Sequence, residues 1–558
     1  MADQPLEPSV SVEYQYLLQA ITTCAAPVVH QLVRQLPGLV NQKGWSGHTP
    51  LHKASLGGDW TINYLLLEAG ADPNCCNDNQ ETPLHYACKR GDVSVVHLFV
   101  QHKGDLTALD KQGNGMMHFA ATTSSVYVFH YLHSIHGLSF RELNHDQQTP
   151  LHICCDSGSS DIAVKYLLRK ERSDLLKKDR SGNTPLHMAA NQGHAFLSWL
   201  LLLAGGFQLL HVTNNKGQTP GDLAQAGSKF THKNLAPVLA KLAKQPRTEF
   251  PKGPILLWYW YLLMPSILYA ATVVIAQIID APYQGYVILV GLGCIVFMLR
   301  SHSHRIMHIS RWPNPVYAGT FGAGLLHTFI IYVYQILPEI YHYHVLTLVS
   351  AALAATTLYL YFRLLHDNPG VTRTSAFKDN SRELMTMLDI VGPPPKLGLF
   401  CPDCEIVHSV RTKHCRLCEH CFEEMDHHCL FLLNCVAKNN HLMFVWFLIV
   451  LSVSMLVFVI NAVVYCSEMY RSHVTTDLFG DLFKADAWLL SLVGLNVVSS
   501  FWSINLVRFQ LNLVSLGLTT FLRPSNTDTV LTSTERVINA IYFLQGKPIF
   551  VKDPLFDV

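Results

Sequence analysis

Residues 401–435, CPDCEIVHSVRTKHCRLCEHCFEEMDHHCLFLLNC, hold seven of the fifteen cysteines in this 558-residue chain. Two of them form a pair Cys401-x2-Cys404, and Asp426-His427-His428-Cys429 stands near the end of the stretch. Packing alone imposes no such spacing. Cysteine pairs with two residues between them, followed by histidines, are typical of structural zinc sites. The stretch therefore predicts metal-binding chemistry.

The number of candidate ligands exceeds what two closed zinc sites need. The seven cysteines together with His414 and His428 make nine groups. Two four-coordinate sites of the Cys3His type use eight of them and leave one thiol free. A closed site has no open position at which to activate water or substrate, so we expect structural ions and one reactive cysteine. A zinc-binding module without chemistry is the alternative.

A repeat dominates the first 225 residues. Thr-Pro-Leu-His occurs four times, a degenerate copy begins at Gly115, and Thr-Pro closes the series at Thr219, with steps of 33, 33, 34, 35 and 35 residues. This period and tetrapeptide resemble ankyrin repeats. Thr would cap a helix, Pro would take its first position, Leu would enter the core and His would tie its turn to a neighbouring repeat. A worn extra copy covers about 14–40, which gives an array of six to seven repeats over 14–225.

The rest of the chain is much more apolar. Overall, 49% of the residues are hydrophobic and 15% are charged, which excludes a wholly soluble protein. A net charge of +1 gives no electrostatic case for nucleic acid. After a basic linker at 226–252, uncharged runs long enough to cross a bilayer predict membrane helices. These runs are 254–279, 315–337, 343–365, 442–466 and 487–511, with a shorter sixth at about 284–299.

The distribution of charge predicts the orientation. Lys and Arg are absent from the short links at 280–283 and 338–342, and they occur in the linker, in the loop after residue 299 and in the tail. We therefore expect both termini and the cysteine-rich loop on the cytosolic side, where thiols stay reduced. The first residues have no signal-peptide pattern, so insertion would depend on the later spans. The expected domains are the array, the linker, four spans at 253–366, the cytosolic loop at 367–441, two spans at 442–511 and a cytosolic tail at 512–558.

Residues 401–444 resemble the cysteine-rich domain of the DHHC protein acyltransferases, or palmitoyltransferases. The fused repeats and the position between the fourth and fifth spans resemble the ankyrin-bearing, huntingtin-interacting members. The implied fold is α-helical: an ankyrin solenoid followed by six transmembrane helices with an inserted zinc-binding domain. The resemblance implies two interleaved zinc sites. One would be held by Cys401, Cys404, His414 and Cys421, and the other by Cys415, Cys418, His428 and Cys435.

The same resemblance implies protein S-acyltransferase activity. Cys429 would be the nucleophile, His427 its base and Asp426 the group that orients the base. Palmitoyl or another long-chain acyl group would pass from acyl-CoA to Cys429 and then, by a ping-pong mechanism, to cysteines of substrate proteins recruited by the repeats. Arg411 and Lys413 are candidate contacts for the CoA phosphates. The membrane would be that of the Golgi, of vesicles or of the endoplasmic reticulum.

The chain departs from the family pattern at several accessory positions. Leu430-Phe431 replaces a Pro-Trp pair, Asn368 replaces an Asp before Pro-Gly, and Leu522 replaces the acidic residue of a Thr-Thr-x-Glu motif. These changes bear on acyl-CoA selectivity and turnover. The alternative function is therefore a weakly active or inactive membrane scaffold that recruits clients or partner acyltransferases. A cation channel with ankyrin repeats is disfavoured, because the loop before the last span has no re-entrant apolar segment.

Overall fold

The computed structural model consists of two compact units. One unit combines Met1–Lys252 with Thr374–His408, and the other combines Gly253–Arg373 with Ser409–Val558. The structure describes residues 12–123, 125–158, 160–170, 175–279, 283–301, 305–306, 308, 311–378, 383–392, 395–469, 486–520 and 531–549.

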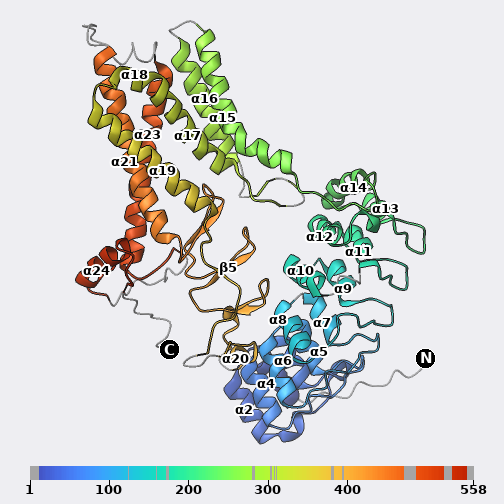
Figure 1. Ribbon diagram of the computed structural model, residues 1–558. Coiled ribbons are helices and arrows are strands. Elements are labelled where there is room, and N and C mark those ends of the chain that lie inside the picture. Colours follow the sequence, from blue (N-terminus) through green and yellow to red (C-terminus); the bar gives the residue numbers. More distant parts are fainter. Residues whose placement is uncertain are drawn as a thin grey trace. The chain divides into compact units, whose positions relative to one another are not determined.

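The first unit is a solenoid of helix pairs (Figure 1). The N-terminal pair falls where the worn repeat was predicted. The helices, taken in consecutive pairs, are α1 (Val12–Thr22), α2 (Ala26–Gln35), α3 (Pro50–Gly57), α4 (Trp60–Glu68), α5 (Pro83–Arg90), α6 (Val93–Gln101), α7 (Met116–Thr123), α8 (Val126–His130), α9 (Pro150–Ser157), α10 (Asp161–Lys170), α11 (Pro185–Gln192), α12 (Ala195–Gly205), α13 (Pro220–Ala226) and α14 (Phe230–Leu242).

The repeated tetrapeptide has the structural role that its chemistry predicts. In α3, Thr49 is the N-cap and donates its backbone N–H to Nδ1 of His52 at 3.1 Å. Nε2 of the same imidazole bonds the carbonyl oxygen of Glu81, one repeat further on, at 3.0 Å. The helix ends at Gly58, whose φ of 77° suits glycine. His52 therefore caps its own helix and links two repeats, and His152 and His187 bond in the same way.

The segment 374–408 packs on the array within the same unit. It contains α20 (Leu388–Val391) and the hairpin β2 (Phe400–Cys401) and β3 (Ile406–Val407). The ring of Phe400 lies 4.7 Å from the ring of His130 on α8. Lys170 at the end of α10 forms an ion pair with Glu405 at 2.7 Å. The second helices of two repeats thus support the turn that carries Cys401 and Cys404.

The second unit contains the membrane helices, of which five are long and apolar enough to span a bilayer among the residues described. They match the predicted long runs, while the sixth run forms a helix whose apolar part, Gln284–Phe297, is shorter. Many apolar side chains on these helices face outward, as contact with lipid requires. The helices are α15 (Ile255–Ile278), α16 (Gln284–Ser301), α17 (Val316–Ile331) continued through 332–340, α19 (His344–His366), α21 (His441–Met469) and α23 (Ala487–Ser515).

Short strands and one helix complete this unit. β1 (Val371–Thr372), β5 (His420–Phe422) and β4 (Lys413–Cys415) form a small sheet, and β6 (His427–Cys429) pairs antiparallel with β7 (Asn434–Val436). α24 (Ser533–Leu544) packs on α23. Cys429 and its hairpin lie in an apolar cluster with side chains of α19 and α21, which anchors the hairpin against the membrane helices.

Candidate functional site

Two turns of identical geometry begin the cysteine-rich region. In each turn, the second cysteine donates its backbone N–H to Sγ of the first at 3.4 Å, in Cys401/Cys404 and in Cys415/Cys418. The next residue is a glutamate with a φ of 58°, whose N–H bonds the carbonyl of the first cysteine at 2.7 Å. These bonds bring both sulfurs of a pair to one side of the turn, as a shared metal ion requires.

The cluster of Cys415, Cys418, His428 and Cys435 has the dimensions of a tetrahedral zinc site. Bonds of about 2.3 Å to sulfur and about 2.0–2.1 Å to nitrogen place two sulfurs about 3.8 Å apart, and a sulfur and a nitrogen about 3.5 Å apart. In this cluster, Nδ1 of His428 lies 3.6, 3.3 and 3.6 Å from the three sulfurs, in the order given. Sγ of Cys418 lies 3.6 Å from Sγ of Cys435. The donor set therefore fits zinc.

The second cluster consists of Cys401, Cys404, His414 and Cys421. Its four ligand atoms lie within 4.8 Å of one another. His414 and Cys421 face each other across β4 and β5, with Nδ1 and Sγ 3.8 Å apart. These clusters match the two interleaved sets that the family resemblance implied, and they use every cysteine of the region except Cys429.

Alternation along β6 separates metal binding from the remaining groups. Successive side chains of a strand point to opposite faces. His428 lies opposite Cys435 in the register of the hairpin and turns its Nδ1 toward the metal cluster. His427 and Cys429 therefore share the other face of the strand. The strand thus holds one metal ligand between two residues that are free for chemistry.

A buried carboxylate orients His427. Asp426 is fully buried, and its Oδ2 accepts a hydrogen bond from Nδ1 of His427 at 2.7 Å. The same oxygen accepts from Nε2 of Gln510 on α23 at 2.9 Å, while Oδ1 accepts from the backbone N–H of Thr520 at 2.6 Å. Asp426, His427 and Cys429 therefore follow one another as carboxylate, imidazole and thiol, which are the groups of a triad that activates a nucleophile.

Electrostatics favours the charged forms of the acid and the base. Burial alone would raise the pKa of Asp426, but the bond from His427, the charge of His441 and the N–H of Thr520 outweigh it and hold that pKa far below its usual range. Burial alone would lower the pKa of His427, and the bonds to Asp426 and Cys429 overcome it and raise the pKa to about 9. A basic imidazole beside a thiol is what proton removal from Cys429 requires.

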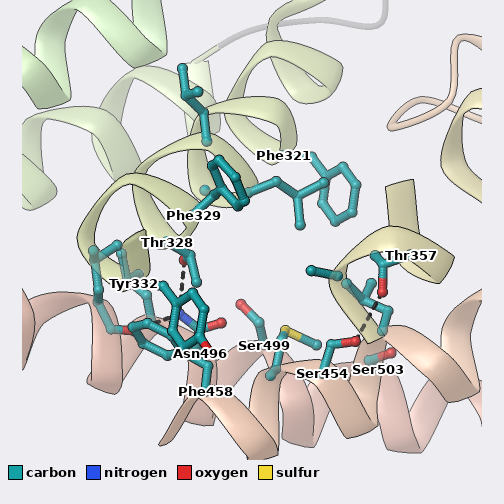
Figure 2. Close-up of a pocket in the computed structure, with 18 of the residues that line it drawn as sticks. Phe321, Thr328, Phe329, Tyr332, Thr357, Ser454, Phe458, Asn496, Ser499 and Ser503 are labelled. Carbon is teal, nitrogen blue, oxygen red and sulfur yellow. Dashed lines mark hydrogen bonds between the residues drawn. The ribbon is translucent and has the colours of Figure 1, made fainter. Parts of the chain in front are cut away.

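A cavity of about 750 Å³ opens between α17, α19, α21 and α23. Phe431, two residues after Cys429, forms part of its wall. Figure 2 shows the rings of Phe321 and Phe329 on one side of the space and Ser454 and Ser499 on the other. Its polar wall groups are mostly paired between helices, such as Thr357 with Ser454 at 2.9 Å. An apolar chain therefore fits this space better than a polar ligand does.

The other candidate residues lie at the edges of the site. Lys413 is exposed, whereas the guanidinium of Arg411 donates to the carbonyl oxygen of Gly517 at 3.1 Å. The side chain of Asn368 closes a turn by accepting from the N–H groups of Gly370 and Val371. Leu522 lies outside the described residues.

Two residues that contact this site were not anticipated from the sequence. Gln510 touches Asp426 directly, and His441 lies behind it, with its Nε2 2.9 Å from Oε1 of Gln510. The available signal was a glutamine inside an apolar span, since polar residues in membrane helices are rare and often functional. Nothing in the local spacing connects either residue to Asp426.

The fold and the two clusters define a membrane protein with an ankyrin array and a cysteine-rich, zinc-binding domain that carries one spare thiol. Residues 396–525 match the family model described as DHHC palmitoyltransferase. Residues 51–140 and 117–209 match the model of ankyrin repeats in three copies. The chain therefore contains a DHHC palmitoyltransferase domain preceded by ankyrin repeats, which confirms the resemblance inferred from the motifs.

Curated relatives are similar to more than half of this chain. The human protein named Palmitoyltransferase ZDHHC13 is 25% identical over 402 residues, or 68% of this chain and 60% of its own length. Palmitoyltransferase AKR1 of Mortierella alpina is 25% identical over 322 residues, or 55% of this chain and 54% of its own. This chain thus spans about 60% or less of these relatives. The solved ankyrin repeat domain of human ASB11 aligns with 41% of this chain and 98% of its own, with 25% identity and a TM-score of 0.36.

Proposed function

We propose that this chain is a protein S-acyltransferase that transfers a palmitoyl or similar long-chain acyl group from acyl-CoA to cysteines of substrate proteins. The observation that carries the proposal is the line Cys429, His427 and buried Asp426, set beside two clusters that use the region's other cysteines. In this assignment the two zinc ions are structural, and Cys429 is the nucleophile. The alternative of an inactive scaffold does not require such a line.

The proposed reaction has two thioester exchanges. His427 takes the thiol proton of Cys429, and the thiolate attacks the carbonyl carbon of acyl-CoA. The bond from that carbon to the CoA sulfur breaks, and CoA leaves with the proton from His427. In the second exchange, His427 takes the proton of a substrate cysteine, whose thiolate attacks acyl-Cys429 and restores the free thiol. One thioester replaces another in each step, so the ping-pong sequence needs little driving force.

The cavity is the proposed site of the acyl chain. Each CH2 removed from water contributes roughly 0.8 kcal/mol, so a chain of about 16 carbons gains most by lying between membrane helices. Phe431 lines this space two residues from the proposed nucleophile, so the carbonyl carbon would lie at Cys429 while the chain extends past Phe431. Arg411 and Lys413 remain the proposed contacts for the CoA phosphates, and the guanidinium of Arg411 also donates to the carbonyl oxygen of Gly517.

The remaining parts of the proposal concern partners and location. The array would recruit substrate proteins as peptides on the surface that stacked repeats leave free. The charge distribution supports an orientation with both termini and the zinc domain in the cytosol. Golgi, vesicle or endoplasmic reticulum membranes are the proposed location, by analogy with the family.

The function is tested with purified full-length protein and labelled palmitoyl-CoA. We expect a hydroxylamine-sensitive label on one peptide, the one that contains Cys429, because hydroxylamine cleaves thioesters. Label transfer to an added cysteine-containing substrate would follow. If protein that retains two zinc ions takes up no label, the acyltransferase proposal fails and the scaffold function replaces it.

A second prediction concerns the cavity. Gly324 lines it, and a Cβ built there meets nothing within 4 Å, so Gly324→Phe places a ring in the space without a backbone clash. Displacing two CH2 groups costs about 1.6 kcal/mol, so palmitoyl labelling should fall roughly tenfold or more while octanoyl labelling persists. The matched control is Gly494→Phe, on α23, which also has open surroundings and does not line the cavity. Equal palmitoyl labelling of the two variants would contradict this assignment.

A further inference from the structure

The hydrogen bonds around Asp426 continue beyond the three residues assigned to chemistry. Gln510 is 1% exposed and lies on α23, 84 residues away in sequence. Its Nε2 shares the carboxylate oxygen Oδ2 with Nδ1 of His427. Both donors bond the same oxygen atom. The position of the Gln510 amide therefore helps to set the position of the oxygen that accepts from His427.

The orientation of the Gln510 amide follows from its partners. An ionised carboxylate only accepts hydrogen bonds, so the amide nitrogen must face Asp426 and the amide oxygen must face His441. That oxygen lies 2.9 Å from Nε2 of His441, which must therefore carry a proton. His441 thus prevents the amide from rotating and removing its donor from Asp426.

His441 is itself held in place. It begins α21, is 7% exposed, and its ring packs against Phe543 of α24 with centroids 5.1 Å apart and an interplanar angle of 64°. Its neighbour Asn440 donates to the carbonyl oxygen of Cys435 at 2.9 Å, on the hairpin that carries Cys429. Three helices therefore hold the amide, while the hairpin holds the residues on which it acts.

We infer that Gln510 and His441 are positioning residues for acyl transfer: Gln510 fixes the Asp426 carboxylate so that it accepts from Nδ1 of His427, and His441 fixes Gln510. This inference rests on the proposed function. With Nδ1–H bound to Asp426, Nε2 of His427 is the nitrogen left to take the thiol proton. Loss of one hydrogen bond to a charged group corresponds to a factor of about 10 to 100 in rate when the bond matters in the transition state.

The test uses full-length protein with Gln510→Met, which keeps the length of the side chain and removes both hydrogen bonds. We expect kcat for label uptake from palmitoyl-CoA to fall about 10- to 100-fold, with KM and the zinc content unchanged. The rate at which iodoacetamide alkylates Cys429 at neutral pH should fall in parallel. This rate is measured by mass spectrometry of the peptide that contains Cys429. Asn505→Met is the matched control, because this exposed residue of the same helix bonds only its own helix at Phe501 and should keep wild-type rates.

His441→Phe keeps an aromatic ring against Phe543 and removes the imidazole that bonds Gln510. We expect a smaller fall in kcat, and a double variant no slower than Gln510→Met, because both residues act through one carboxylate. If Gln510→Met loses zinc, the kcat and the alkylation rate of His441→Phe test the inference in its place. Wild-type kcat and alkylation in the zinc-replete variants would overturn the inference. Rapid alkylation of Cys429 in wild type without any acyl label would instead refute the proposed function and leave the positioning role intact.

Discussion

Replacing Cys429 with serine is expected to abolish the acyl adduct while both zinc ions remain bound. A thiolate attacks a thioester readily, whereas a serine hydroxyl beside the same imidazole remains protonated and reacts far more slowly. Cys429 faces away from the metal cluster on β6, so its sulfur is not a ligand. The measurement is label from palmitoyl-CoA per chain together with zinc per chain by elemental analysis. We expect no hydroxylamine-sensitive label and a zinc content equal to that of wild type.

The matched control is Cys435→Ser, on the neighbouring strand of the same hairpin. Cys435 is a ligand in the cluster with His428, so its replacement should release one zinc ion. The pair separates two explanations of a lost adduct, since a general loss of folding would lower both label and zinc in either variant. Zinc loss in Cys429→Ser, or a persistent adduct in it, would remove Cys429 from the role of nucleophile.

The metal clusters could be predicted from the sequence because their geometry is mostly local. A Cys-x2-Cys turn brings two sulfurs together through bonds within five residues, and the hairpins add the partners a few residues later. The count of nine candidate ligands left one thiol, but the identity of that thiol came from the family resemblance. The register of β6 and β7 supplies the physical reason, since Cys429 and the ligand His428 face opposite sides.

The solenoid was predictable for a similar reason. Each Thr-Pro-Leu-His contains its own N-cap, first-turn proline, core residue and capping histidine, so a single repeat specifies its helix start. The membrane helices followed from the length of their apolar runs. The weakest run, at 284–299, forms a helix whose apolar part is shorter than those of the five long spans.

Contacts between residues far apart in the sequence could not be predicted. Gln510 reaches Asp426 only because α23 packs along α21, and Arg411 meets Gly517 106 residues later. Asp426 was expected to orient His427. Its bond from the backbone N–H of Thr520 does not depend on the side chain of Thr520, so the residue type at this position does not predict the bond. The cavity likewise depends on how four helices pack. Spacing indicates which residues share a turn, whereas three-dimensional packing determines which residues share a carboxylate.

The second large effect is expected from His428→Ala compared with His427→Ala. These neighbours lie on one strand and face opposite sides, one toward Cys415, Cys418 and Cys435 and the other toward Asp426. Structural zinc contributes about 10–16 kcal/mol of apparent binding free energy in small domains, and this free energy is also folding free energy. His428→Ala should therefore release one zinc ion, unfold the β6–β7 hairpin and lose the adduct, because Cys429 is part of that hairpin.

His427→Ala should keep two zinc ions, because its imidazole binds no metal in this assignment. Its unfolding temperature should fall less than that of His428→Ala, because Asp426 keeps its hydrogen bonds from Gln510 and Thr520. Loss of a positioned base costs about 10²- to 10⁴-fold in rate, so its label uptake should fall by that factor. The measurements are zinc per chain, thermal unfolding and label uptake in both variants. Two zinc ions in His428→Ala would refute the ligand set. Zinc loss in His427→Ala would mean that β6 presents the opposite face to the metal. Cys429 would then face the metal as well, and no spare thiol would remain for the proposed chemistry.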